Sequence, residues 1–127
     1  MDEEISFAQF GKWADEILEK VPEAIMRDLN GGVQLAREAR RELNDPPGVY
    51  YLGEYIADPY LGHMVIIYYG SFRKVLAGEG PEVWREELEK TIWHELRHHV
   101  ETLAGVDDLV EEDVKELFRM RAEADEK

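Results

Sequence analysis

The stretch that decides the fold is Thr91-Ile-Trp-His-Glu-Leu-Arg-His-His-Val100. It contains His94-Glu95-x-x-His98, in which two histidines stand four residues apart. On a helix this spacing places both imidazoles on one face, about 6 Å apart along the axis. Such a pair can bind one tetrahedral zinc ion, and Glu95 can then take a proton from a zinc-bound water. The motif therefore predicts a zinc-binding helix that also carries a catalytic carboxylate.

The same helix has an apolar stripe, formed by Trp93, Leu96, Val100 and Leu103. At about 100° per residue these positions fall roughly 180–260° from His94, while His98 falls near 40°. The helix thus has a ligand face and a core face, as a zinc site requires. The alternative is a surface helix that carries two histidines without any ligand role.

Composition points to one acidic domain. The 127 residues and the hydrophobic content of 44% suit a single core, so we treat residues 1–127 as one domain. The formal net charge of −14 argues against nucleic acid as a partner, because phosphate binding needs clustered Lys and Arg. With no cysteine, metal ligands must be histidines and carboxylates. No membrane span or signal-peptide pattern is present, so we expect a cytoplasmic protein.

Hydrophobic periodicity predicts the surrounding elements. The expected helices cover residues 7–20, 22–29, 72–76, 82–104 and 109–124. The expected strands cover residues 32–36, 49–56 and 63–69, and the last two could form a hairpin. Ser6 should cap the first helix, Pro22 should begin the second, and Gly105 should stop the central one. Residues 37–43 have a helix-forming composition, which leaves their conformation ambiguous.

The order of strands followed by an HExxH helix resembles the zincin metallopeptidases. The small size and the His98-His99 doublet resemble the minimal zincin-like metallopeptidases in particular. Other supporting segments are Asn30–Val33, Leu52–Tyr55, Leu61–Gly62 and Ile67–Phe72. The resemblance implies an α+β fold, with a small mixed or antiparallel sheet packed against the HExxH helix and helices at both ends of the chain. It also implies zinc-dependent hydrolysis of peptide bonds, with Glu95 activating the water.

A third zinc ligand is expected beyond the motif, because catalytic zinc sites usually have three protein ligands and a water. The related Asp-zincin pattern, HExxH-x-x-G-x-x-D, implies Asp108 by resemblance, since Gly105–Asp108 matches its last part four residues late. From helical geometry alone Glu101 competes, because it shares the face of both histidines one turn beyond His98. Asp113 is a third candidate.

The other histidines and the strand tyrosines are given structural interpretations. His99 falls near 140° on the helix, so we expect it to be buried and hydrogen-bonded to a carbonyl. His63 begins a strand and has no partner at metal-ligand spacing. A tyrosine phenol could stabilise an oxyanion, but strand aromatics more often pack in the core. The tyrosines concerned are Tyr55, Tyr68 and Tyr69.

The expected partner is a peptide or protein substrate. The resemblance to zincins implies that it lies extended along a sheet edge, for which strand 63–69 could serve by β-addition. One alternative is a catalytically silent zincin-like domain that binds metal or another protein. A further alternative is a structural domain whose metal site is empty.

Overall fold

The computed structural model describes residues 5–60 and 62–106 of the chain. The elements in order are α1 (Phe7–Glu19), α2 (Glu23–Met26), β1 (Gly32–Ala36), β2 (Gly53–Asp58), β3 (Gly62–Tyr68), α3 (Tyr69–Val75) and α4 (Pro81–Val106). The expected α+β class with a small mixed sheet is confirmed. The helix predicted at 109–124 lies outside the described residues.

The three strands form one sheet in the order β1-β3-β2. β1 pairs with β3 in parallel, with Val33 opposite Val65, and β2 pairs with β3 antiparallel, with Tyr55 opposite Val65. The predicted hairpin is therefore confirmed. The expectation that strand 63–69 offers an open edge to a peptide is wrong, because β3 is the central strand and both of its edges are paired. The outer strand on the α4 side is β2.

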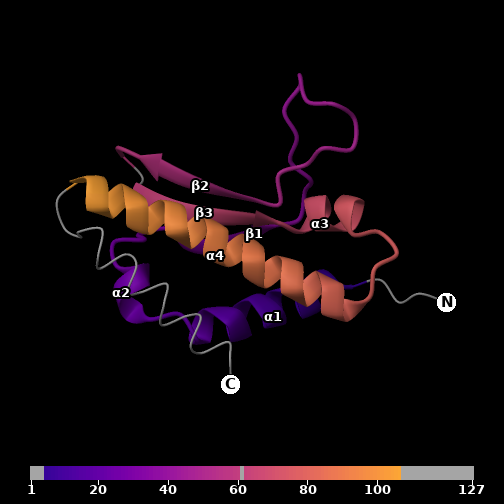
Figure 1. Cartoon of the computed structure of the whole chain (residues 1–127), viewed down its shortest axis with the longest axis horizontal. Helices are drawn as coiled ribbons and strands as arrows, with labels where there is room; N and C mark the ends of the chain where they lie inside the picture. Colours follow the sequence, from indigo (N-terminus) through magenta and orange to yellow (C-terminus); the bar gives the residue numbers. More distant parts are fainter. Residues whose placement is uncertain (1–4, 61, 107–127) are drawn as a thin grey trace.

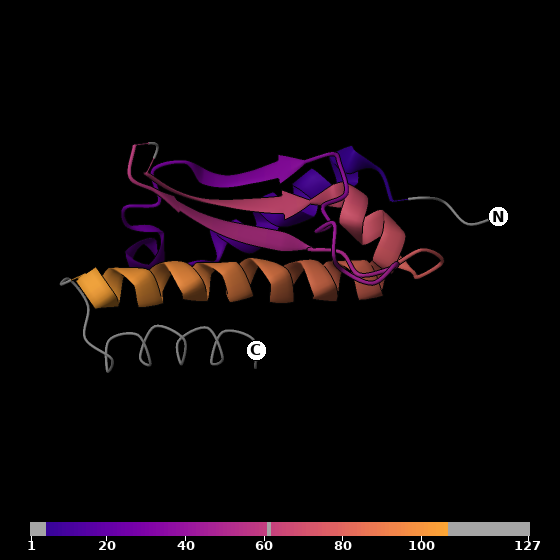
Figure 2. The ribbon, with the colours of Figure 1, turned by 90° about the horizontal axis from the view of Figure 1, so that it is seen from above.

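Helix α4 runs along the length of the sheet, and α1 lies beside it (Figures 1 and 2). The core fills the space between these helices and the sheet face that carries Val65 and Ile67, both of which are fully buried. Burying one such side chain contributes roughly 1.5–3 kcal/mol. The predicted apolar stripe of α4 is confirmed, because Trp93, Leu96, Val100 and Leu103 are all buried. The core thus fixes which face of α4 turns away from the sheet.

The N-terminal helices follow the predicted pattern only in part. Ser6 caps α1 as expected, since its Oγ accepts a hydrogen bond from the backbone N–H of Gln9 at 3.0 Å. Pro22 is the N-cap of α2 rather than its first helical residue. The second helix ends at Met26 instead of residue 29, because Arg27 is extended and Asp28 adopts the left-handed φ of 62°.

The segment between β1 and β2 is a long projecting loop rather than a helix (Figure 1). Its base is held by a bridge between Arg40 and Tyr51, and the Arg40 backbone N–H donates to Ser71 Oγ at 2.9 Å. These long-range contacts override the helix-forming composition of residues 37–43.

Other element boundaries also differ from the predictions. β2 begins at Gly53 rather than at residue 49, and α3 begins at Tyr69 rather than at residue 72. α4 continues through Gly105 to Val106, so this glycine does not stop the helix. In the part of the chain that is described, no helix is both long and apolar enough to cross a membrane.

Candidate metal centre

His94 and His98 project from the exposed face of α4, and their imidazoles converge. Their Nε2 atoms lie 3.2 Å apart, and the two rings are nearly perpendicular at 85°. Two histidines that bind one tetrahedral zinc ion, with Zn–N bonds of about 2.0–2.1 Å, hold their nitrogens about 3.3–3.4 Å apart. The pair therefore has the spacing and the donor chemistry that a shared zinc ion needs.

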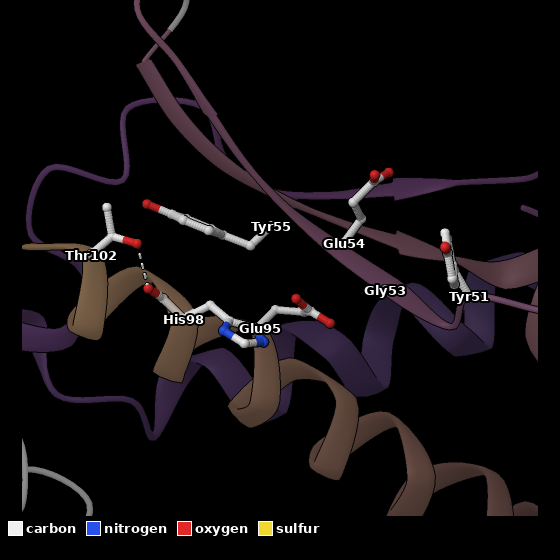
Figure 3. A pocket seen from close by; sticks show the side chains of 7 residues that line it. All are labelled: Tyr51, Gly53, Glu54, Tyr55, Glu95, His98 and Thr102. Carbon is white, nitrogen blue, oxygen red and sulfur yellow. Dashed lines mark hydrogen bonds between the residues drawn. The ribbon is translucent and has the colours of Figure 1, made fainter. Parts of the chain in front are cut away.

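The side chain of Glu95 points away from the histidine pair and toward the sheet. Its side chain is buried, with a relative exposure of 7%, and Figure 3 shows its carboxylate pointing into the space between α4 and β2. Burial raises the pKa of the Glu95 carboxyl, while the charges of His94 and His98 lower it and that of Glu54 raises it further. A raised pKa brings a carboxylate closer to the range in which it can both accept and return a proton.

A groove runs between β2 and α4 across the histidine pair. It consists of two adjoining hollows of about 460 and 420 Å³, which share Tyr51, Gly53 and Glu95 as lining residues. His98 lines the first hollow and His94 lines the second. Glu95 therefore lines the β2–α4 groove together with both histidines of the pair.

The third ligand is not found among the residues the structure describes. Within 5–60 and 62–106, no group of three or more His, Cys, Asp or Glu side chains could hold a metal ion. The Glu101 side chain is 54% exposed, and its Oε1 lies 3.6 Å from Nε of Arg97, with which it forms an ion pair. Asp108 and Asp113 lie outside the described residues.

His99 has the structural role that its helical position predicted. It is fully buried, and its Nε2 donates a hydrogen bond of 2.6 Å to the Arg27 carbonyl. Burial lowers the pKa of His99 and so favours the neutral imidazole. The prediction of a buried histidine bonded to a carbonyl is confirmed.

The tyrosines make packing and hydrogen-bond contacts. The Tyr68 hydroxyl donates to Oε1 of Glu54 at 2.8 Å, and the Tyr69 hydroxyl donates to the Ile5 carbonyl. The Tyr55 hydroxyl contacts two histidines, Nδ1 of His63 at 2.6 Å and Nδ1 of His99 at 2.8 Å.

Sequence reasoning missed this grouping of Tyr55 with the two histidines. The hairpin register could have indicated part of it. It pairs Tyr55 with Val65, so Tyr55 and His63 lie diagonally on the same face of the sheet.

Comparisons with known proteins agree with this geometry. The chain matches the model of the zincin-like metallopeptidases over residues 36–119. It is similar to the solved structure of a conserved hypothetical protein from Thermus thermophilus, with 40% sequence identity and a TM-score of 0.70, over 80% of this chain and 100% of that one. A search of curated proteins found no match. Because the family model spans well over half of the sequence, the chain belongs to the zincin-like metallopeptidase family.

Proposed function

We propose that this protein is a zinc-dependent peptidase in which His94, His98 and Asp108 bind the metal and Glu95 is the general base. One observation carries the proposal most directly. The two Nε2 atoms stand 3.2 Å apart, close to the spacing that one tetrahedral ion imposes, and the buried Glu95 lines the same groove as both histidines. Asp108 is included because of its place in the G-x-x-D portion of the Asp-zincin pattern.

A zinc ion held by these residues would act as a Lewis acid toward water and toward a substrate carbonyl. Glu95 would accept the proton of the attacking water and deliver it to the leaving amine. Its burial against β2 supports both steps, because a carboxylate shielded from solvent keeps one orientation and holds a proton more readily.

The substrate that fits the β2–α4 groove is an extended peptide. β2 pairs with β3 along one edge, and no other strand pairs with it within residues 5–60 and 62–106. Its backbone groups can therefore accept a peptide by β-addition beside α4. This assignment replaces β3 by β2 as the docking strand and leaves the peptide nature of the partner as proposed.

The test is zinc titration and metal analysis of the wild-type protein beside His94→Ala and Glu95→Gln. We expect about one zinc per chain in the wild type, loss of binding in His94→Ala and retained binding in Glu95→Gln. We also expect the wild type to cleave members of a broad peptide library and Glu95→Gln to cleave none.

Two results would overturn the proposal. A wild-type protein that binds no zinc would not be a zinc peptidase. Zinc binding without cleavage of any peptide would point to the catalytically silent, metal-binding alternative. Circular dichroism of each variant would show that lost function does not come from unfolding.

A further inference from the structure

Tyr55, His63 and His99 form one hydrogen-bonded group, which we call the Tyr55 cluster. The Tyr55 hydroxyl lies 2.6 Å from Nδ1 of His63 and 2.8 Å from Nδ1 of His99. The other ring nitrogen of His99 bonds to the Arg27 carbonyl at 2.6 Å. The cluster therefore joins α4 to β2, to β3 and to the segment that follows α2.

The directions of these hydrogen bonds follow from their partners. A carbonyl can only accept, so Nε2 of His99 carries a proton and donates it to Arg27. In the neutral ring Nδ1 is then an acceptor, and the Tyr55 O–H donates to it. The Tyr55 oxygen is left to accept from the N–H of His63. Each hydrogen bond of the Tyr55 cluster then has one donor and one acceptor, which favours a single rigid arrangement of its side chains.

Within the described residues, the rings of His94 and His98 have no outer hydrogen-bond partner of this kind. In zinc sites the second ring nitrogen of a histidine ligand usually donates to an outer partner that holds the ring in place. Among residues 5–60 and 62–106, the only hydrogen bond of the His94 and His98 rings is the one between their Nε2 atoms. In this part of the chain, the orientation of both rings is set by the way α4 itself is held.

His99 directly follows His98, so the two side chains leave α4 about 100° apart. Fixing His99 on the inner side of the helix fixes the direction in which His98 leaves it. The inner side is fixed by full burial of the imidazole and by hydrogen bonds to both of its nitrogens.

We propose that Tyr55 is a positioning residue for the zinc ligand His98, acting through its hydrogen bond to His99. The inference rests on the proposed zinc site. Figure 3 shows the phenol of Tyr55 lying along the groove, with its hydroxyl turned toward the Thr102 end of α4 and away from Glu95. Tyr55 thus fixes the orientation of α4 at the proposed zinc site, whereas the carboxylate of Glu95 faces the groups that react.

The test compares Tyr55→Phe with the matched variant Tyr69→Phe. Each substitution removes one partly buried hydroxyl and keeps the ring, but the Tyr69 hydroxyl bonds to the Ile5 carbonyl beside α1. Zinc affinity is measured by competition with a chelator, and the visible absorption of the cobalt-substituted protein reports ligand geometry. Melting temperature reports general damage.

We expect Tyr55→Phe to weaken zinc binding about tenfold, the lower end of what loss of an outer-sphere partner costs, and to alter the cobalt spectrum. Tyr69→Phe should lower the melting temperature by a similar amount and leave affinity and spectrum unchanged. His63→Ala, at a partly exposed position, removes the bond from His63 to Tyr55 and the ring contacts of His63 with Tyr55 and His99, and leaves the bond between Tyr55 and His99 in place. It should therefore give a smaller change in the same direction.

The outcomes separate this inference from the proposed function. If the wild type binds zinc and both Tyr55→Phe and His63→Ala match it in affinity and spectrum, Tyr55 does not position the ligand and the zinc site stands. Equal loss of affinity in Tyr69→Phe would also overturn the inference, because general destabilisation would then explain the effect. A wild type that binds neither zinc nor cobalt overturns the proposed function, and the inference with it.

Discussion

Gly53 of β2 lies directly against the side chain of Glu95 of α4. A Cβ atom on residue 53 would stand 3.2 Å from Cγ of Glu95 and 2.8 Å from Cγ2 of Thr91. Gly53 does not have a positive φ, so its requirement is space and not an unusual backbone conformation. The missing side chain allows α4 to approach β2 at the level where Glu95 borders the groove.

We therefore expect Gly53→Ala to displace Glu95 and to lower peptidase kcat/KM by about 100-fold, the cost that a displacement near 1 Å can have. Overpacking at this point should also lower the free energy of unfolding by about 1–3 kcal/mol. Steady-state kinetics and urea unfolding of the same preparation measure the two effects.

The matched control is Gly11→Ala in α1. A Cβ there would lie 3.5 Å from Cδ1 of Leu35, an ordinary contact, and alanine favours the helix by about 0.5–1 kcal/mol. This variant should be slightly more stable and fully active. Wild-type activity in Gly53→Ala would show that the Gly53–Glu95 contact does not set the position of the base.

Of the glycines whose surroundings the structure describes, Gly70 should be the most sensitive to alanine substitution. A Cβ there would lie 2.4 Å from the Ala39 nitrogen and 2.4 Å from the Glu38 carbonyl carbon, and these backbone atoms cannot rotate away. We expect Gly70→Ala to lower the free energy of unfolding by at least about 3 kcal/mol, the upper range for overpacking.

The matched substitution Gly80→Ala enters open space and should change that free energy by less than about 0.5 kcal/mol. Urea unfolding of both variants provides the comparison. If Gly70→Ala and the wild type unfold at the same urea midpoint, the base of the projecting loop does not pack tightly against Gly70.

The features that sequence could predict are those set by local periodicity. The positions of His94 and His98 on one face of α4, and of His99 toward the core, follow from about 100° per residue and are found as expected. The extra parallel pairing of β1 with β3 joins residues about 30 positions apart, so no local pattern reveals that β3 is central. The Tyr55 cluster depends on the same kind of long-range registration.

Tyr68 should make the folded protein sensitive to alkaline pH. Burial, together with its hydrogen bond to the Glu54 carboxylate, raises the pKa of Tyr68 to about 12. The unfolded phenol has a pKa of about 10, so folding favours the protonated form. The resulting stabilisation is fully present below about pH 10 and is lost as pH rises toward 12.

Urea unfolding as a function of pH, compared between wild type and Tyr68→Phe, tests this dependence. The variant should show a weaker fall in stability above about pH 10. In an alkaline titration followed by tyrosinate absorbance, it should lack the tyrosine that ionises at the highest pH. Identical alkaline slopes in the two proteins would contradict the assignment to Tyr68.

The third ligand can be settled by comparing Asp108→Asn with Glu101→Gln. Glu101 forms an exposed ion pair with Arg97, and such pairs are worth about 0–1 kcal/mol, so Glu101→Gln should leave zinc affinity within about threefold of wild type. Asp108→Asn should weaken zinc binding by more than about 100-fold, because a lost ligand costs more than a lost outer-sphere partner.

Asp107→Asn is the matched control, since it removes the same charge one residue earlier. Zinc competition assays at one ionic strength rank the three variants, and a Glu101→Gln protein weaker than Asp108→Asn would make Glu101 the ligand instead.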